Sequence, residues 1–514
     1  MLRLALVLLK AGCLGFADEQ SGSALFIKAY SSQGQALSSS GFLSHIGPAD
    51  RKDGGPNGVF ITDMDGNPVD ERPRLDASAP RPTLRWRGSK RVRISLPWPV
   101  AGDGFSYVVI DKEGMGYGDG EDILLNREIA LTQYRLFQKY FDQRRGVWDP
   151  PYRPGREFLQ LRQETTLAIA RAKAATVDPE RAVLYERALH QISLAWAKML
   201  FEHGSQIARN PSSRPKLRWG LTLDASLLDR LPDHKKIFER LRESGADWVR
   251  LVFSLNPQDF LYAREASFIE YDSIVAELHR LDIRILGSVL DSVLWPKNLT
   301  PESMAERTGH LVLHYKGRIH SWEVGSELNG SWLGGYRTPL SDGDILASFI
   351  RAAEEVKRID PTLETVATLY WWEGTAPTAG KATFPWLKRA IARDAFRSVD
   401  LVGLNVFPDE NPMGMSLDPV FHQLGELLPK QKLMLGAFGY ASAEELKGYW
   451  WLDPKDAESA RKDLLILYTG AACAMPRSVG GGFWWTTLTQ MFPADGRTTD
   501  LAKVHRRTLL RLGR

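Results

Sequence analysis

The sequence predicts a multidomain protein: an N-terminal β-sandwich, a helical connector and a C-terminal (β/α)8 barrel. Three changes of pattern along the chain support this prediction. Up to about residue 122, short alternating apolar runs are separated by turn residues, and from there to about residue 212 the apolar period becomes 3.6. Beyond residue 212, short apolar runs alternate with amphipathic stretches. These patterns are typical of antiparallel strands, of helices and of a parallel sheet with crossover helices, respectively.

The chain length agrees with this division. Its 514 residues allow about three domains at roughly 150 residues each. We therefore expect a segment over 1–17 that resembles a signal peptide, a β-sandwich over 18–122, a helical connector over 123–212 and the barrel over 213–514.

The N-terminus carries the features of an export signal. Arg3 precedes an apolar run that ends at Phe16, and the small residue Ala17 follows. This pattern predicts cleavage after Ala17 and a secreted or periplasmic protein. Lys10 interrupts the apolar run, so a first β-strand of the mature domain, and with it a cytoplasmic location, stays open as the alternative. No later run is long enough to span a membrane.

Composition excludes several classes of function. The net charge is only +4 and the basic residues are scattered, which gives no indication of a nucleic-acid partner. Two cysteines form neither a disulfide framework nor a metal motif, and no histidines have metal-ligand spacing. We expect no metal and no organic cofactor.

Eight apolar segments of the C-terminal part are predicted to be the strands of the barrel. They cover residues 219–223, 248–253, 284–289, 319–324, 365–369, 401–406, 433–436 and 482–485. In such a barrel the chemistry is carried at the carboxyl ends of the strands.

The fourth predicted strand ends in the most informative motif, Trp-Glu-Val-Gly-Ser-Glu-Leu-Asn over residues 322–329. Glu323 lies inside the strand and is expected to pair with a cation or a backbone group. Glu327 falls just past the strand end, where an acid can face a cleft. Aromatic rings beside it would raise its pKa and hold the face of a sugar, which suits a proton donor to a glycosidic oxygen. The plainer alternative is a surface glutamate in a loop. The rings expected beside it are Trp295, Trp332 and Trp372.

The barrel segments resemble the clan-A retaining glycoside hydrolases, the group of barrel xylanases, β-xylosidases and β-glucanases. The matching segments are 245–251, 283–287 with Trp295, 322–330, 399–405 and 481–485. The resemblance implies that Glu327 is the acid/base and that Arg250 supports the catalytic carboxylates from below. The order of the three parts also resembles some xylanase-type proteins of environmental bacteria. The residues expected to contact substrate are Ser326, Asn329, Trp295, Trp332, Trp372, Glu373, Asn405 and Trp485.

The sequence departs from this family at the seventh strand. The family has its nucleophilic glutamate there, followed by an aromatic residue and glycine, whereas residues 437–439 read Ala-Phe-Gly. A methyl group cannot attack an anomeric carbon, so Ala437 marks a vacant nucleophile position. Ser326 also replaces the usual asparagine, and Asn405 with Phe407 stands where histidine or tyrosine is usual.

Three explanations of Ala437 stay open: an engineered inactive variant, a natural pseudo-enzyme, or another carboxylate that serves instead. The two further departures favour natural divergence. An inverting reaction tolerates a base roughly 6.5–9.5 Å from the acid. The carboxylates at strand ends are Asp224, Asp291, Glu373, Asp409 and Glu410, and Glu373 is favoured because three aromatic residues precede it.

The leading hypothesis is a glycoside hydrolase that cleaves O-glycosidic bonds of a polysaccharide or oligosaccharide with Glu327 as the general acid/base. The alternative from another class is a non-catalytic protein that binds glycan. A scaffold without a ligand is the third hypothesis, and it would have its loop tryptophans packed away from solvent.

Overall fold

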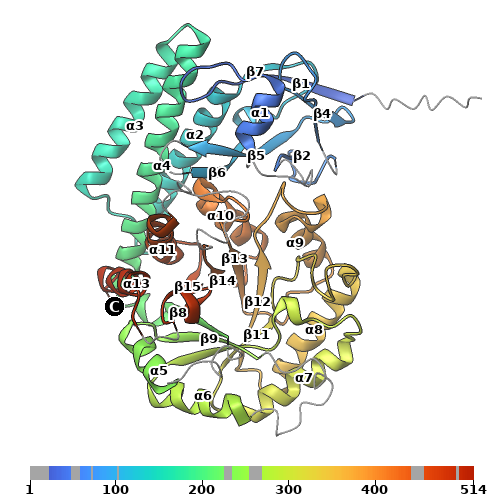
Figure 1. The fold of residues 1–514 in the computed structure, drawn as a ribbon, viewed down its shortest axis with the longest axis vertical. Helices are drawn as coiled ribbons and strands as arrows, with labels where there is room; N and C mark the ends of the chain where they lie inside the picture. The colour runs from blue at the N-terminus through green and yellow to red at the C-terminus, as the bar shows by residue number, and fades with distance from the viewer. Residues whose placement is uncertain are drawn as a thin grey trace, which may run out of the picture.

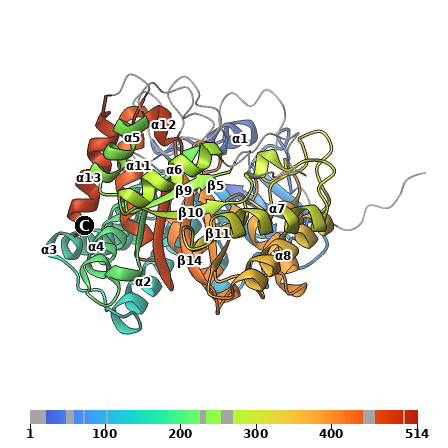
Figure 2. The same cartoon turned by 90° about the horizontal axis from the view of Figure 1, so that it is seen from below.

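A computed structural model describes the fold of most of the chain (Figures 1 and 2). The described residues are 22–47, 58–70, 73–100, 104–224, 234–253, 269–440, 457–493 and 497–513. The predicted signal segment 1–17 lies outside them, and so do the side chain of Asp224 and the doublet Trp450–Trp451.

The N-terminal part forms two small sheets beside one short helix, α1 (Ser39–Ile46). One sheet has the order β3-β4-β1-β7 and the other β2-β5-β6. All pairings are antiparallel except that of β1 with β7, which is parallel. The predicted packing of these sheets as a sandwich stays a prediction. The strands are β1 (Gly22–Lys28), β2 (Phe60–Thr62), β3 (Arg74–Leu75), β4 (Thr83–Arg87), β5 (Arg93–Val100), β6 (Gly104–Ile110) and β7 (Asp122–Leu124).

Three long helices follow: α2 (Leu125–Gly146), α3 (Arg156–Ala174) and α4 (Asp178–Arg209). Each buries an apolar stripe at 3.6-residue spacing, as the sequence predicts. The helices pack on one another, and α4 continues down the side of the barrel against α11 (Figure 1). A buried ion pair ties the connector to the barrel, because Arg144 on α2 contacts Asp418 at 2.5 Å.

The C-terminal part is a closed barrel of eight parallel strands, which confirms the predicted barrel. Its interior is filled by side chains from several strands, among them Trp248, Leu286 and Phe483. Gly220 makes room for this filling, since a Cβ there would lie 2.1 Å from the Phe483 ring. The strands are β8 (Arg218–Asp224), β9 (Trp248–Val252), β10 (Arg284–Ser288), β11 (Ser321–Gly325), β12 (Glu364–Tyr370), β13 (Leu401–Val406), β14 (Lys432–Phe438) and β15 (Ser478–Trp484).

Helices surround this cylinder (Figure 2). They are α5 (His234–Glu243), α6 (Ile269–Arg280), α7 (Pro301–His314), α8 (Asp342–Ile359), α9 (Thr383–Ala392), α10 (Leu417–Leu427), α11 (Ala457–Ala472), α12 (Thr487–Gln490) and α13 (Asp500–Arg511). Within the part of the chain that the structure describes, no helix is both long and apolar enough to cross a membrane.

The N-terminal sheets rest on loops that follow β12 and β13 (Figure 1). The hydroxyl of Tyr107 on β6 accepts a 2.9 Å hydrogen bond from the backbone N–H of Gly374. The Tyr107 N–H donates to the carbonyl of Met413 at 3.1 Å, and its ring packs edge-on against Trp371. The N-terminal part therefore supports loops at the carboxyl end of the barrel.

Candidate active site

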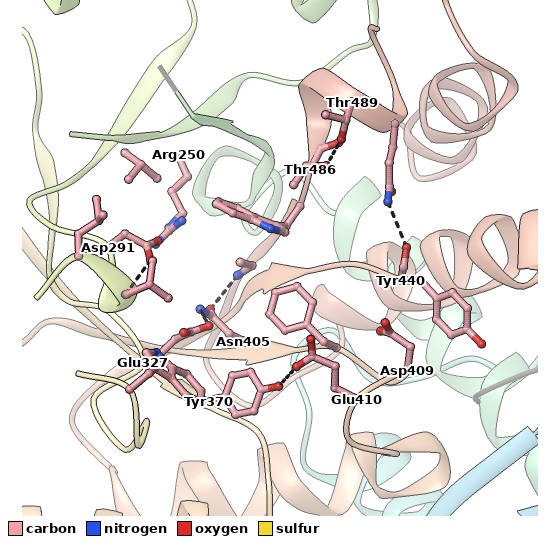
Figure 3. Close-up of a pocket in the computed structure, with 18 of the residues that line it drawn as sticks. Arg250, Asp291, Glu327, Tyr370, Asn405, Asp409, Glu410, Tyr440, Thr486 and Thr489 are labelled. Carbon is pink, nitrogen blue, oxygen red and sulfur yellow. Dashed lines mark hydrogen bonds and ion pairs between the residues drawn. The ribbon is translucent and has the colours of Figure 1, made fainter. Parts of the chain in front are cut away.

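A cavity of about 930 Å³ opens at the carboxyl ends of the barrel strands. Its lining comes from several strand ends, as expected for a catalytic barrel. Arg250 comes from β9, Tyr370 from β12, Asn405 from β13 and Ala437 from β14. Figure 3 shows Asp291, Glu327 and Arg250 at one end of this cavity, with Asp409, Glu410 and Tyr440 at the other.

Glu327 lies in the turn that follows β11 and lines the cavity. Its φ of 49° lies in the left-handed region, which a glutamate rarely adopts. Residues held in such a conformation occur often at functional sites. The Glu327 N–H donates to Oγ1 of Thr368 at 3.1 Å, and the N–H of Leu328 donates to the Thr368 carbonyl at 3.1 Å. Strand β12 thus holds the turn in this conformation.

Two side chains donate hydrogen bonds to the Glu327 carboxylate. Ser292 Oγ donates to Oε2 at 2.6 Å, and Asn405 Nδ2 donates to Oε1 at 3.0 Å. Both donors are oriented by other groups: the indole N–H of Trp332 donates to Ser292 Oγ at 2.8 Å, and the backbone N–H of Ala437 donates to Asn405 Oδ1 at 2.8 Å. Each oxygen of the Glu327 carboxylate thus accepts a hydrogen bond from a side chain that another group orients.

The pKa of Glu327 is raised to about 7. Burial is the main cause, and the negative charge of Asp291 adds to it. The hydrogen bonds from Asn405 and Ser292 and the charge of Arg250 lower the pKa in part. A carboxyl group with this pKa is half protonated near neutral pH, which suits a proton donor.

Beneath Glu327 lies a buried ion pair. Arg250 contacts Glu323 through Nη2 at 2.7 Å and Nε at 2.8 Å, and Thr368 Oγ1 donates to Glu323 at 2.8 Å. The prediction that Glu323 pairs with a cation is confirmed. Arg250 also lies 3.4 Å from Ser326 Oγ, so this serine contacts the arginine and does not line the cavity.

Ala437 lines the cavity near the end of β14. Its N–H is engaged by Asn405, whose close approach is possible because residue 436 is glycine: a Cβ there would lie 2.1 Å from Asn405 Oδ1. The position that the family resemblance assigns to a nucleophile therefore presents only a methyl group to the cavity.

The expected sugar-contacting residues separate into two groups. Trp332, Trp485 and Asn405 line the cavity, whereas Trp295, Trp372, Asn329 and Glu373 do not. Trp372 is buried, donates from its indole to the Lys381 carbonyl at 2.7 Å and packs edge-on against Trp332. Asn329 is fully buried and bridges both backbone groups of Tyr370. These two residues support the cavity wall from behind.

Glu373, which the sequence favours as a second carboxylate, is buried away from the cavity. Burial raises its pKa to about 8. It precedes Gly374, whose N–H is bound by Tyr107 of the N-terminal part. Its carboxyl group instead accepts a hydrogen bond from the backbone of Phe384 and interacts with the charges of Arg93 and Lys388.

Sequence reasoning missed Ser292 and Tyr370. Ser292 is fully buried and contacts Glu327 across 35 positions of the chain, and Tyr370 lines the cavity and donates its hydroxyl to Glu410. The one available signal for Ser292 was its place after the third strand, beside Asp291. Within the described ranges, no group of three or more His, Cys, Asp or Glu side chains is arranged to hold a metal ion.

Comparison with known proteins gives weak similarity only. No protein-family model and no curated protein sequence matches this chain. Among solved structures, a family 1 β-glucosidase from Thermotoga maritima is 12% identical with a TM-score of 0.42, over 58% of this chain and 98% of the other. A fungal β-1,4-galactanase is 13% identical with a TM-score of 0.42, over 57% of this chain and 99% of the other. Similarity of this size does not identify an activity.

Proposed function

We propose that this protein hydrolyses O-glycosidic bonds of a polysaccharide or oligosaccharide, with Glu327 as the proton donor. The observation that carries the proposal is the environment of this carboxyl group. It is half-buried at the cavity wall, its pKa is raised to about 7, and the side chains that bind it are donors. A general acid requires such a group, which is partly protonated at neutral pH and lines a cavity that can hold a ligand.

The lining of the cavity supports a sugar as that molecule. Trp332 and Trp485 provide flat apolar surfaces, and Asn405, Thr486 and Gln490 provide polar groups for hydroxyls. The volume of about 930 Å³ falls near the upper end of the range for ligand pockets and is large enough for more than one sugar unit. An export signal over 1–17 would place the protein where extracellular glycans occur.

In the proposed reaction, the glycosidic oxygen lies beside Glu327 and receives its proton as the bond to the anomeric carbon breaks. Ser292 and Asn405 then stabilise the carboxylate that forms, since each donates a hydrogen bond to one of its oxygens. The buried Arg250 adds positive charge nearby.

One observation favours a second candidate function, a non-catalytic protein that binds glycan. Ala437 presents a methyl group where the family resemblance implies the nucleophile, and a retaining reaction needs two carboxyl groups about 5–5.5 Å apart. A protein that kept the cavity and lost turnover would bind the same ligands.

A panel of plant and microbial polysaccharides, measured for both binding and release of reducing ends, separates the two. Hydrolysis that is lost in Glu327→Gln with binding retained supports the enzyme. Binding without hydrolysis supports the second candidate. Hydrolysis that continues unchanged in Glu327→Gln would contradict the proposed role of Glu327.

A further inference from the structure

Asp291 is the carboxylate with the strongest influence on Glu327. After burial, its charge is the largest cause of the raised pKa of Glu327. Asp291 and Glu327 line the same end of the cavity (Figure 3). The two are also joined through the chain, because Ser292 directly follows Asp291 and donates to Oε2 of Glu327 at 2.6 Å.

Contacts with Val293 and Arg250 help to hold the Asp291 side chain in place. Its Oδ1 accepts a 3.2 Å hydrogen bond from the N–H of Val293, and through this bond Asp291 caps the short 3-10 helix Ser292–Leu294. Its Oδ2 lies 3.8 Å from Nη2 of Arg250. One oxygen thus fixes the group, while the other faces the guanidinium at the floor of the cavity.

Two other carboxylates of the cavity lining have partners of their own. Glu410 accepts the hydroxyl of Tyr370, and Glu458 pairs with Arg461. Glu410 and its neighbour Asp409 lie at the far end of the cavity from Asp291 (Figure 3). Asp291 is therefore the carboxylate best placed to act on the same bond as Glu327.

We propose that Asp291 is the second catalytic carboxylate, acting as the general base in an inverting hydrolysis. This inference rests on the proposed function of Glu327. A water molecule gives one proton to the Asp291 carboxylate while its oxygen bonds to the anomeric carbon. The glycosidic C–O bond breaks at the same time, and the leaving oxygen takes the proton of Glu327. Both side chains then return to their starting states by exchange of one proton with solvent.

Asp291 is assigned the role of a base rather than a nucleophile because its contacts with Val293 and Arg250 anchor it. A nucleophile must bond to the anomeric carbon, whereas a base acts through a water molecule and needs a wider separation from the acid. The hydrogen bond to Val293 and the contact with Arg250 keep Asp291 at the wall of the cavity. With only a methyl group at position 437, the inverting route needs no residue on β14.

Asp291→Asn is the decisive variant, because an asparagine oxygen still accepts the hydrogen bond from Val293 while the basicity is lost. Asp360→Asn is the matched control: Asp360 accepts a 2.9 Å hydrogen bond from the N–H of Thr362 in the same way and lies outside the cavity lining. The probes are the α- and β-fluorides of glucose, xylose and galactose. Fluoride leaves without protonation, so turnover of these compounds depends on the base and not on Glu327.

We expect NMR to show a first-formed product of inverted anomeric configuration. Asp291→Asn should lower kcat on the fluoride by about 10²–10⁴-fold with little change in KM. Glu327→Gln should retain fluoride turnover while losing polysaccharide hydrolysis. Asp291→Asn should also lower the pKa of Glu327, followed by ¹³C NMR of its carboxyl carbon, because a like charge is removed.

Retention of configuration, turnover in Asp291→Asn equal to that in Asp360→Asn, or no turnover of any of these fluorides would overturn this inference. These outcomes are distinct from failure of the proposed function. If Glu327→Gln loses polysaccharide hydrolysis and Asp291→Asn does not, only the role of Asp291 is wrong. If Glu327→Gln hydrolyses polysaccharide normally, the proposed function itself fails.

Discussion

Asn405 donates a 3.0 Å hydrogen bond from Nδ2 to Oε1 of Glu327. The orientation of this amide is fixed, because its Oδ1 accepts the backbone N–H of Ala437 at 2.8 Å. One side chain on β13 thus links the candidate acid after β11 to the vacant position on β14. The family resemblance places two carboxylates at these two positions, and here one carboxylate and one backbone amide share a single asparagine.

Asn405→Leu should raise the pKa of Glu327 above its value of about 7. The hydrogen bond from Asn405 stabilises the charged form, so its loss favours the protonated form. A hydrogen bond to a charged group contributes about 1.5–3 kcal/mol, and its loss corresponds to a rise of about 1–2 in the pKa of Glu327. The alkaline limb of the pH–rate profile, or ¹³C NMR of the carboxyl carbon, measures this. An unchanged or lowered pKa would show that Asn405 does not stabilise the carboxylate.

Ala437→Glu should restore the missing carboxylate at the end of β14. We expect hydrolysis of aryl glycosides with retained configuration, at least about tenfold faster than in Ala437→Gln, because a nucleophile and an acid then face one another. Ala437→Gln matches the size of the new side chain without its charge. Equal rates in the two variants would contradict the assignment of position 437 as the vacant nucleophile position.

Glu323→Gln should strongly destabilise the fold. Glu323 and Arg250 are both buried and lie 2.7 Å apart, so the substitution leaves a buried guanidinium without its main counter-charge. Removal of one partner of a buried pair costs about 3–5 kcal/mol. The thermal midpoint measures the loss. Glu277→Gln breaks a more exposed contact with Arg280 on one helix and should cost less than about 1 kcal/mol. Equal effects of the two substitutions would show that the buried pair is not important for stability.

Glu186 should make the protein less stable as the pH rises. Burial raises its pKa to about 7 despite hydrogen bonds from Asn126 and Trp98, while its ordinary value is 4.5. The folded state therefore holds the proton more tightly, and stability falls as the pH rises from about 4.5 through 7. The thermal midpoint of Glu186→Gln should lose this part of the pH dependence. A parallel decline in both proteins would show that Glu186 does not contribute.

Much of the barrel could be predicted from the sequence because its strands are short apolar runs with helices between them. All eight predicted strands are present, with ends that differ by a few residues, as in the last strand, predicted over 482–485 and found at Ser478–Trp484. That Glu323 pairs with a cation or a backbone group also followed from the rule that a buried carboxylate needs a partner, although the sequence did not identify Arg250 as that partner.

The orientation of side chains beyond the strand ends could not be predicted. Alternation along a strand no longer applies once the strand has ended, and Trp372 and Glu373, which follow β12, are buried and do not line the cavity. Trp295 is likewise buried behind the wall. The contact of Ser292 with Glu327 joins two loops that are distant in sequence. A single serine forms no sequence pattern from which such a contact could be predicted.

The role of Glu327 is tested most directly by the leaving-group dependence of hydrolysis in wild type and Glu327→Gln. An alkoxide leaving group must be protonated as it departs. Dinitrophenolate, the leaving group of a dinitrophenyl glycoside, departs without protonation. We predict that Glu327→Gln slows the former by about 10²–10⁴-fold and leaves the latter nearly unchanged. Equal rates for wild type and variant on both substrates, or an equal loss on both, would contradict Glu327 as the proton donor.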